Sequence, residues 1–226
     1  MDVDSWRRIG GDALALLLAA SCPGCERSGT LLCDGCRMLL RAEPQQVLTP
    51  AGLPVHAALR YEGVPARAIR RLKEDGATIL ARPLGAALTG ILRTSGAGAL
   101  IVPVPTSRAA FRRRGYRVPD LLVRRAGASA HRLLVPARRT GDQRGLGREA
   151  RARNVSASMC AARRGQGRVV IVDDVVTTGA TLDEAARALR AAGFTPVCAV
   201  ALAATPRLHD TVKSSGADSD MSVYGD

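Results

Sequence analysis

One 13-residue segment, from Val169 to Thr181, constrains this chain more than any other. It begins with four apolar residues, continues through Asp173 and Asp174, and ends in a run of small hydroxyl and glycine residues. A short apolar run predicts a buried strand, and the residues that follow predict a loop that opens a helix. Adjacent carboxylates at the end of a buried strand are costly unless they are paired or bind something. The segment therefore predicts a strand–loop–helix unit with a functional site at its turn.

The chemistry expected at this turn is anion binding. Backbone amides of a loop and of a helix N-terminus form a cradle for phosphate, and Gly179 permits a close approach. Carboxylates at the carboxyl end of a strand can accept hydrogen bonds from ribose hydroxyls or hold Mg²⁺. A structural alternative exists for Thr181, because Thr181 and Glu184 also form a capping box for the helix. That alternative leaves the two acids unexplained.

Strands and helices alternate around this segment. Predicted strands cover 55–61, 100–104, 133–135, 169–172 and 197–202, and predicted helices cover 65–73, 77–92, 121–130 and 182–192. This alternation predicts an α/β fold with a doubly wound parallel sheet over residues 55–206.

The segments outside this domain have their own signatures. Residues 1–44 are expected to hold a short helix at 5–20 and a small cysteine module. Residues 41–54 are rich in Pro and Gly and are expected to be a linker, and the Arg- and Gly-rich stretch at 137–154 a mobile loop. The tail at 207–226 is expected to be disordered.

Four of the six cysteines form two Cys-x-x-Cys pairs: Cys22, Cys25, Cys33 and Cys36. Four thiolates suit tetrahedral Zn²⁺, and a full Cys₄ shell leaves no position for water, so the metal would be structural. Gly24 and Gly35 are expected to let each turn fold back so that backbone amides face the sulfurs. The alternatives are a pair of disulfides, which a cytoplasmic location disfavours, or a redox site. Cys160 and Cys198 are expected to be ordinary core residues.

The net charge of +13 is concentrated in one part of the chain. Residues 107–168 hold 17 Arg against Asp120, Asp142 and Glu149, a local net charge of +14. Such a block suits a polyanion such as pyrophosphate, a nucleotide or nucleic acid. The alternative is a solvated face set by an Arg-rich composition, since Lys occurs only twice.

No apolar run reaches the roughly 18 residues that a membrane span needs. The apolar stretch at 13–20 faintly resembles a lipoprotein leader, but acidic residues stand where a leader is basic. The chain is therefore expected to be cytoplasmic.

The sequence VVIVDDVVTTGAT at 169–181 resembles the signature of type I phosphoribosyltransferases that binds phosphoribosyl pyrophosphate (PRPP). The resemblance implies Mg²⁺ as a cofactor, and Asp173 and Asp174 as the catalytic acids that bind the ribose hydroxyls. It also implies a 5′-phosphate loop made of Thr177, Thr178, Gly179, Ala180 and Thr181. Val102–Arg108 resembles the pyrophosphate loop of these enzymes, which implies pyrophosphate contacts from Thr106, Ser107 and Arg108.

Other segments narrow the resemblance to the ComF family, the competence-associated phosphoribosyltransferase-like proteins. Arg113–Tyr116 resembles the family's RGFNQ element, although Arg117 and Val118 replace its Asn-Gln pair. The family pattern is also matched by an LK element at Lys73, by the N-terminal Cys₄ module, and by the residues RRTGDQ at 138–143 with Leu146, Arg151 and Asn154. Arg138, Arg139 and Arg144 are expected to close over the site as a lid, and the alternative is that their loop is an exposed basic arm. Phe111, Tyr116 and Phe194 are expected to be engaged within helices or loops, which leaves no aromatic hood for a nucleobase.

The resemblance implies a PRPP- and Mg²⁺-binding, phosphoribosyltransferase-like protein linked to DNA uptake or nucleotide metabolism, with an unassigned acceptor. A second hypothesis is a nucleic-acid-binding or regulatory protein that uses the PRPP pocket as a sensor. Its partners would be single-stranded DNA or the DNA-uptake machinery, through the basic segment. A third hypothesis is a nucleotide-salvage enzyme, which the appended Cys₄ module disfavours.

Overall fold

A computed structural model describes residues 21–137 and 158–206 of the chain. Four predictions fall outside these residues: the helix at 5–20, the mobile loop at 137–154 beyond its first residue, the lid arginines Arg138, Arg139 and Arg144, and the tail at 207–226. None of the described helices has the length and apolarity needed to cross a membrane.

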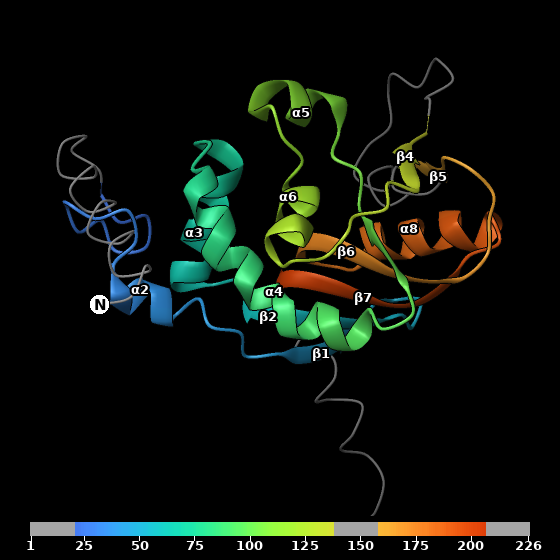
Figure 1. The fold of residues 1–226 in the computed structure, drawn as a ribbon, viewed down its shortest axis with the longest axis horizontal. Helices are drawn as coiled ribbons and strands as arrows, with labels where there is room; N and C mark the ends of the chain where they lie inside the picture. Colours follow the sequence, from blue (N-terminus) through green and yellow to red (C-terminus); the bar gives the residue numbers. More distant parts are fainter. Residues whose placement is uncertain (1–20, 138–157, 207–226) are drawn as a thin grey trace, which may run out of the picture.

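A five-stranded sheet in the order β1-β2-β7-β6-β3 forms the centre of the domain (Figure 1). Its strands are β1 (Gln45–Leu48), β2 (Pro54–Arg60), β3 (Leu100–Pro103), β6 (Arg168–Val176) and β7 (Thr195–Ala204). All neighbours are parallel except β1, which pairs antiparallel with β2 at one edge. The predicted parallel α/β sheet is therefore confirmed, whereas the predicted linker at 41–54 is wrong over β1.

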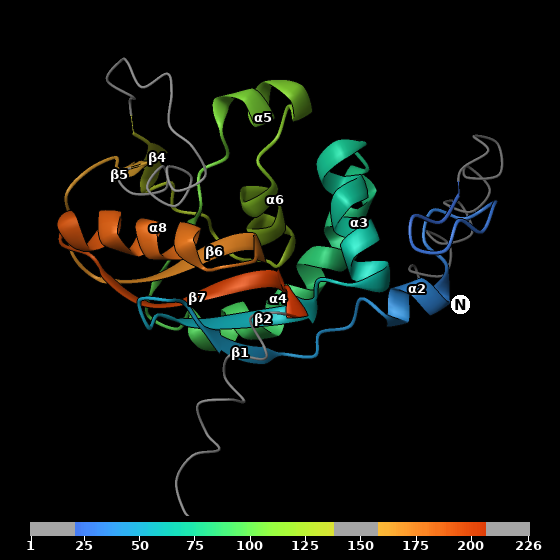
Figure 2. The same ribbon diagram turned by 180° about the vertical axis from the view of Figure 1, so that it is seen from behind.

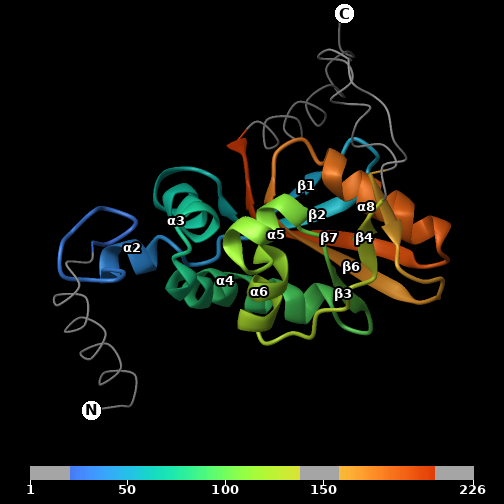
Figure 3. The same cartoon turned by 90° about the horizontal axis from the view of Figure 1, so that it is seen from above.

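Helices cover both faces of this sheet, as expected for a doubly wound fold. One face carries α3 (Gly63–Glu74), the 3₁₀ turn η1 (Thr78–Leu80), α4 (Ala81–Ser95) and α6 (Val118–Arg125), and the other carries α8 (Ala180–Ala191). In Figure 1 α4 lies in front of β2 and β7 and in Figure 2 behind them, while Figure 3 shows α8 on the opposite side from α4 and α6.

The apolar run in β6 is explained by this layering. Val170 and Val172 belong to the core under α4 and α6, and Val169 and Ile171 to the core under α8. Successive strand residues point to opposite faces, so a strand covered on both sides must be apolar at every position.

Three smaller elements complete the described structure: α2 (Asp34–Met38), α5 (Arg108–Arg114) and an antiparallel pair of β4 (Leu134–Pro136) with β5 (Met159–Ala161). The helix predicted at 121–130 in fact begins at Val118, with Pro119 in its first turn, and ends before Gly127, whose φ is +81°. Proline favours a helix start and a left-handed glycine a helix end, so both boundaries follow from these residues.

Gly85 marks the close contact between α4 and α6. A Cβ placed on Gly85 would lie 2.4 Å from the Cβ of Arg125 and 3.0 Å from its carbonyl carbon. We expect Gly85→Ala to destabilise the fold by roughly 1–3 kcal/mol, because overpacking forces the helices apart. Gly90, on the same helix, is exposed and would meet nothing within 4 Å, so Gly90→Ala should stabilise by about 1 kcal/mol. Urea denaturation of both variants measures the difference, and equal effects would contradict the contact.

Candidate functional site

Asp173 and Asp174 lie near the end of β6, which continues two residues beyond them to Val176. The strand runs on because β7 pairs with it as far as Ala204, whereas β3 ends opposite Val172. The acids therefore stand past the end of β3, at the carboxyl edge of the sheet. This is the edge where open α/β sheets bind ligands, as the sequence predicted.

The two acids point to opposite faces of β6 because they are adjacent on a strand. On the α3 side, Lys73 Nζ donates to Asp174 Oδ1 at 2.7 Å, and both side chains are largely buried, 24% and 13% exposed. Asp173 Oδ1 instead accepts the backbone N–H of Asp174 at 2.8 Å. Lys73 thus comes from α3 to neutralise one carboxylate, a pairing across 101 residues that no local pattern revealed.

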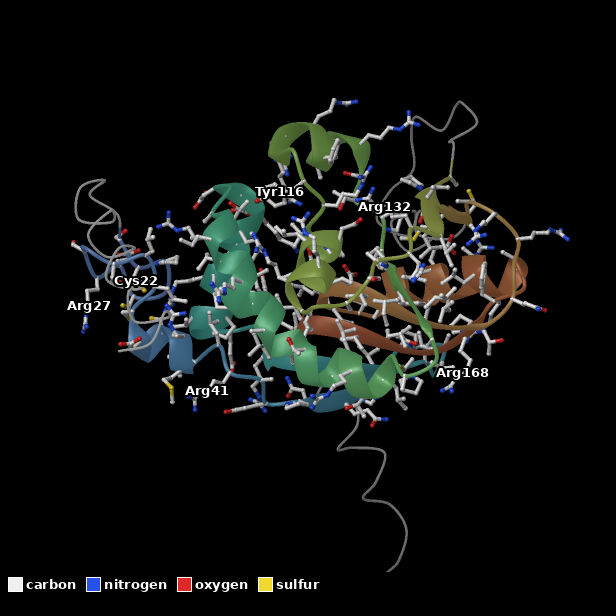
Figure 4. The ribbon with its side chains drawn as sticks, viewed as in Figure 1. Cys22, Arg27, Arg41, Tyr116, Arg132 and Arg168 are labelled. Carbon is white, nitrogen blue, oxygen red and sulfur yellow. The ribbon has the colours of Figure 1, made fainter. Side chains whose placement is uncertain are left out.

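Tyr116 ties this part of α3 to the segment that precedes α6. Its hydroxyl donates to the carbonyl oxygen of Leu72, the residue before Lys73. Figure 4 shows Tyr116 between α3 and α6. Burial raises the pKa of Tyr116, opposed by the positive charge of Arg114, so the phenol stays protonated and able to donate. The position of Lys73 is thereby linked to the loop after α5.

Burial and, next, the negative charge of Asp174 raise the pKa of Asp173, the Asp174 N–H and Lys73 lower it, and the net result is a pKa of about 7. Asp173 is consequently close to half protonated at neutral pH. A cation bound at this edge would favour the ionised form and relieve the penalty. The site is thus ready to exchange a proton for a metal ion or a ligand donor.

The loop from Thr177 to Thr181 leads from β6 into α8. Thr177 and Thr178 are exposed, whereas Gly179 is buried with φ +79° and a Cβ on it would lie 3.0 Å from Thr49 Cβ. Both the left-handed conformation and the close neighbour require glycine here. Ala180 begins α8, and its N–H lies 3.4 Å from Thr178 Oγ1.

The predicted capping box of Thr181 and Glu184 is wrong. The N-cap of α8 is Gly179, which has no side chain to cap with, so Thr181 lies inside the first turn. Glu184 is buried and accepts the backbone N–H of Met159 at 3.1 Å, and Arg187 Nε donates to it at 2.7 Å. The acid therefore fastens β5 to α8 instead of closing the helix.

A contact that the sequence did not predict holds the start of α8. Thr49 Oγ1 donates to Asp183 Oδ1, and the N–H of Ala51 donates to Asp183 Oδ2 at 3.1 Å. Leu53 N–H donates in turn to Thr49 Oγ1 at 3.0 Å. The turn between β1 and β2 is thus fixed against the phosphate-loop candidate, over a separation of 134 residues.

The second candidate loop follows β3, and Val104, the first residue after that strand, still donates its N–H to the carbonyl oxygen of Val172 in β6 at 2.8 Å. Both candidate loops therefore leave neighbouring strands at one edge. Ser107 is the N-cap of α5, where its Oγ accepts the Ala110 N–H at 3.2 Å, so it has a structural role. Thr106 and Arg108 line a cavity of about 300 Å³.

The four cysteines of the N-terminal module form one cluster, as predicted. Their sulfurs all lie within 4.8 Å of one another, with Cys22 and Cys33 3.8 Å apart and Cys25 and Cys33 3.6 Å apart. A tetrahedral Zn–S₄ site with bonds of about 2.3 Å places its sulfurs about 3.8 Å apart. Cys36 N–H also approaches Cys33 Sγ at 3.5 Å, as expected of an amide facing a thiolate. The donor set and its spacing fit zinc.

The pKa values of two thiols in the cluster, those of Cys22 and Cys36, are shifted in opposite directions. Burial raises the pKa of Cys22, but N–H groups of the neighbouring backbone outweigh it and lower the value to about 6. Burial and the other thiols raise the pKa of Cys36 well above its usual range. The Cys22 thiolate therefore forms readily, whereas the Cys36 thiol resists ionisation unless a cation is close to it.

The module packs against α3 and shares its core. Leu32 and Leu40 join the same buried cluster as Val64 and Ala68, and Arg67 Nε donates to the carbonyl of Gly24 at 2.7 Å. A Cβ on Gly24 would lie 2.6 Å from Cys36 Sγ, so glycine is needed there, whereas one on Gly35 would meet nothing within 4 Å. The expectation for Gly35 is thus wrong. Cys198 is buried as predicted, but Cys160 is exposed.

Comparison with known proteins points in one direction. A family model, the phosphoribosyl transferase domain, matches residues 137–222. Competence protein F of Haemophilus influenzae is 34% identical over 102 residues, 41% of this chain and 44% of that protein. Orotate phosphoribosyltransferase of Herminiimonas arsenicoxydans is 48% identical over 59 residues, 26% of this chain and 24% of that protein. The chain thus spans less than half the length of these relatives.

Two solved structures are similar as well. Orotate phosphoribosyltransferase from Aeropyrum pernix covers 80% of this chain and 96% of its own, at 15% identity and a TM-score of 0.35. The match to adenine phosphoribosyltransferase from Saccharomyces cerevisiae covers 80% of this chain and 95% of that protein, at 13% identity and a TM-score of 0.41.

Proposed function

We propose that this chain, which is similar to the phosphoribosyl transferase domain and to competence protein F over part of its length, binds PRPP together with Mg²⁺. The observation that carries the proposal is the pair of acids at the carboxyl edge of β6, with Asp173 at a pKa of about 7 and Asp174 held by Lys73. Such a pair is unfavourable without a ligand and becomes favourable when a cation or ribose hydroxyls meet it.

The parts of PRPP would be distributed over both loops of this edge. The ribose hydroxyls would be accepted by Asp173 and Asp174, and the 5′-phosphate would lie in the loop from Thr177 to Thr181. Pyrophosphate would contact Thr106 and Arg108 after β3. Mg²⁺, when bound, would neutralise charge on the pyrophosphate. Lys73 must release Asp174, or share it, when the ligand arrives.

Phosphoribosyl transfer is the reaction that such a complex supports. An acceptor lone pair forms the bond to C1 of the ribose while the C1–oxygen bond breaks, and pyrophosphate leaves with that electron pair. The acceptor's proton passes to solvent. Arg108 would stabilise the charge that develops on the leaving group. The lid formed by Arg138, Arg139 and Arg144 remains part of the proposal on the sequence pattern alone.

The Cys₄ cluster would hold a structural zinc ion. Four thiolates fill its coordination shell, so no position is left for substrate. Its contribution is to fix residues 21–40 against α3, the helix that carries Lys73.

Calorimetry of PRPP binding, with and without Mg²⁺, tests the main proposal. The native protein should bind PRPP with the help of Mg²⁺, and Asp173→Asn/Asp174→Asn should weaken binding at least about a hundredfold, since two charged hydrogen-bond acceptors are lost. Asp75→Asn, at the exposed end of α3, is the matched control and should bind normally. Failure of the folded, zinc-loaded native protein to bind PRPP would refute the proposal.

A second candidate, nucleic-acid binding, is favoured by the basic surface of α5 and α6. Arg112 and Arg113 on α5 and Arg124 and Arg125 on α6 are all exposed. Fluorescence anisotropy with labelled single-stranded DNA should then give an affinity that falls steeply with salt. Absence of binding at low salt would exclude this candidate.

A further inference from the structure

The cavity beside β3 is lined by two contrasting kinds of side chain. Its apolar surface comes from residues of β3 and β4 and from Phe111, and four guanidinium groups surround it: Arg108, Arg112, Arg117 and Arg132. Figure 4 shows Arg132 between α6 and β4. A volume of about 300 Å³ is at the small end of ligand pockets. The cavity is thus the size of a single substituted ring.

Its charge is strongly positive. Among the lining residues Asp120 is the one acid, and its Oδ1 accepts Arg132 Nε at 2.5 Å. That pair cancels one positive charge and leaves three guanidinium groups unbalanced within the lining. Guanidinium groups match carboxylate and phosphate oxygens in a bidentate geometry. The cavity therefore favours a ligand with an acidic group.

A flat stacking surface distinguishes this cavity from a simple basic patch. The guanidinium of Arg117 lies 4.6 Å from the centroid of the Phe111 ring. Phe111 belongs to helix α5, as expected, but its side chain is 37% exposed because α5 buries none of its residues. Arginine and aromatic planes both stack well on planar ligands. Arg117 also takes the place of the asparagine in the RGFNQ element of the ComF family. It therefore adds both a positive charge and a planar guanidinium group to the cavity.

We propose that the cavity binds a planar heteroaromatic ring that carries a carboxylate or phosphate group. The ring lies against Phe111, Arg117 and the apolar side chains of β4, and the acidic group meets Arg117 and Arg112. The cavity shares Thr106 and Arg108 with the proposed pyrophosphate contacts, but none of the residues at 173–181 lines it, so its occupation by a ring can be tested without PRPP. If the proposed transfer also holds, Thr106 and Arg108 at the rim place such an anion next to the leaving-group loop, where an acidic acceptor would sit.

The test uses three small probes and the full chain, without PRPP or Mg²⁺. Pyridine-2,3-dicarboxylate has the ring and the charge, pyridine-3-carboxamide has the ring alone, and succinate has the charge alone. Calorimetry should show binding of the dicarboxylate, with the other two at least about tenfold weaker, as loss of a charged hydrogen bond or a stacking contact predicts. Equal binding of either partial probe, or no binding of the dicarboxylate, would overturn the proposal.

Variants then locate the site. Arg117→Gln should weaken binding of the dicarboxylate at least about tenfold, through loss of a charged hydrogen bond, and Phe111→Leu should weaken it roughly two- to tenfold, through loss of stacking. Arg124→Gln removes the same charge from the exposed face of α6 outside the cavity and should leave affinity unchanged. An equal loss in Arg124→Gln would mean general surface charge and would refute the assignment. Asp173→Asn/Asp174→Asn should retain binding, which separates failure of this proposal from failure of PRPP binding.

Discussion

Replacing Asp173 by asparagine should stabilise the ligand-free protein at about pH 8 by up to roughly 4 kcal/mol, and at about pH 4 by less than about 1 kcal/mol. The basis is the rise in the pKa of Asp173 from 3.8 to about 7 in the folded state, caused first by burial and then by the neighbouring Asp174 charge. Asparagine keeps the shape of the neutral acid and cannot ionise.

The direction follows from proton linkage. Between about pH 4 and 7 the folded protein holds a proton on Asp173 that the unfolded chain has released, so stability falls as pH rises through this window. Above the folded-state pKa the whole penalty is present, and below the unfolded value there is none. The substitution removes the group, so the part of the pH dependence due to Asp173 should disappear.

Urea denaturation at about pH 4, 6 and 8 measures this effect. Asp75→Asn is the control, because Asp75 is 50% exposed in a surface pair with Arg71 and should leave the pH profile of the native protein intact. A variant at Asp173 that is less stable than the native protein at high pH would contradict the expectation. The same residue should be needed for PRPP, so a gain in stability with a loss of binding is the signature of a functional acid.

The cost of burying Asp173 belongs to the part of the site that could be predicted from the sequence. Two acids after four apolar residues conflict with burial, and that local conflict is visible in the sequence alone. The parallel sheet and α8 were also predictable, because β6 is apolar at every position from Val169 to Val172 and α8 has a regular apolar face. The apolar pattern is strong in β6 because that strand is buried on both faces, and in α8 because that helix buries one stripe of residues.

The parts that sequence reasoning missed depend on distant partners or on exposure. Lys73 reaches Asp174 from another helix, and Thr49 reaches Asp183 across most of the domain. α5 buries none of its residues, so it has no apolar periodicity to detect. β1 is four residues long within a Pro- and Gly-rich stretch, and an edge strand needs only one apolar residue, Val47, to pack. Each of these features depends on contacts between segments that are distant in the sequence, or on a lack of burial, and neither can be read from a local pattern.

Replacing Cys25 by serine should destabilise the protein by several kcal/mol and reduce its zinc content from one ion to none. Cys25 is exposed, so without a metal its thiol contributes little, and an exposed substitution of this kind changes stability by only about 0.5 kcal/mol. With zinc bound, the same residue supplies a quarter of the shell, and structural zinc sites contribute about 10–16 kcal/mol of apparent binding free energy. A large loss of stability on substitution of the exposed Cys25 would therefore be due to loss of the metal and not to loss of packing.

The loss should spread beyond the cysteines, because the module and α3 share one core. Without zinc, Leu32 and Leu40 have less to hold them against Val64, and the hydrogen bond from Arg67 to Gly24 would weaken. Hydrogen exchange should therefore speed up in α3, the helix that carries Lys73. A zinc chelator should reproduce the effect on the native protein.

Two further variants make the expectation decisive. Cys160→Ser, at the exposed cysteine outside the cluster, should change neither zinc content nor stability. Cys36→Ser, at a buried ligand, should lose zinc and stability at least as fully as Cys25→Ser, since it also disturbs the core. If Cys25→Ser is neutral while Cys36→Ser is destabilising, the cluster acts through packing and the metal assignment is wrong. If both fall together with the zinc, the ion holds the module to α3 and so supports the helix from which Lys73 meets the acids of the site.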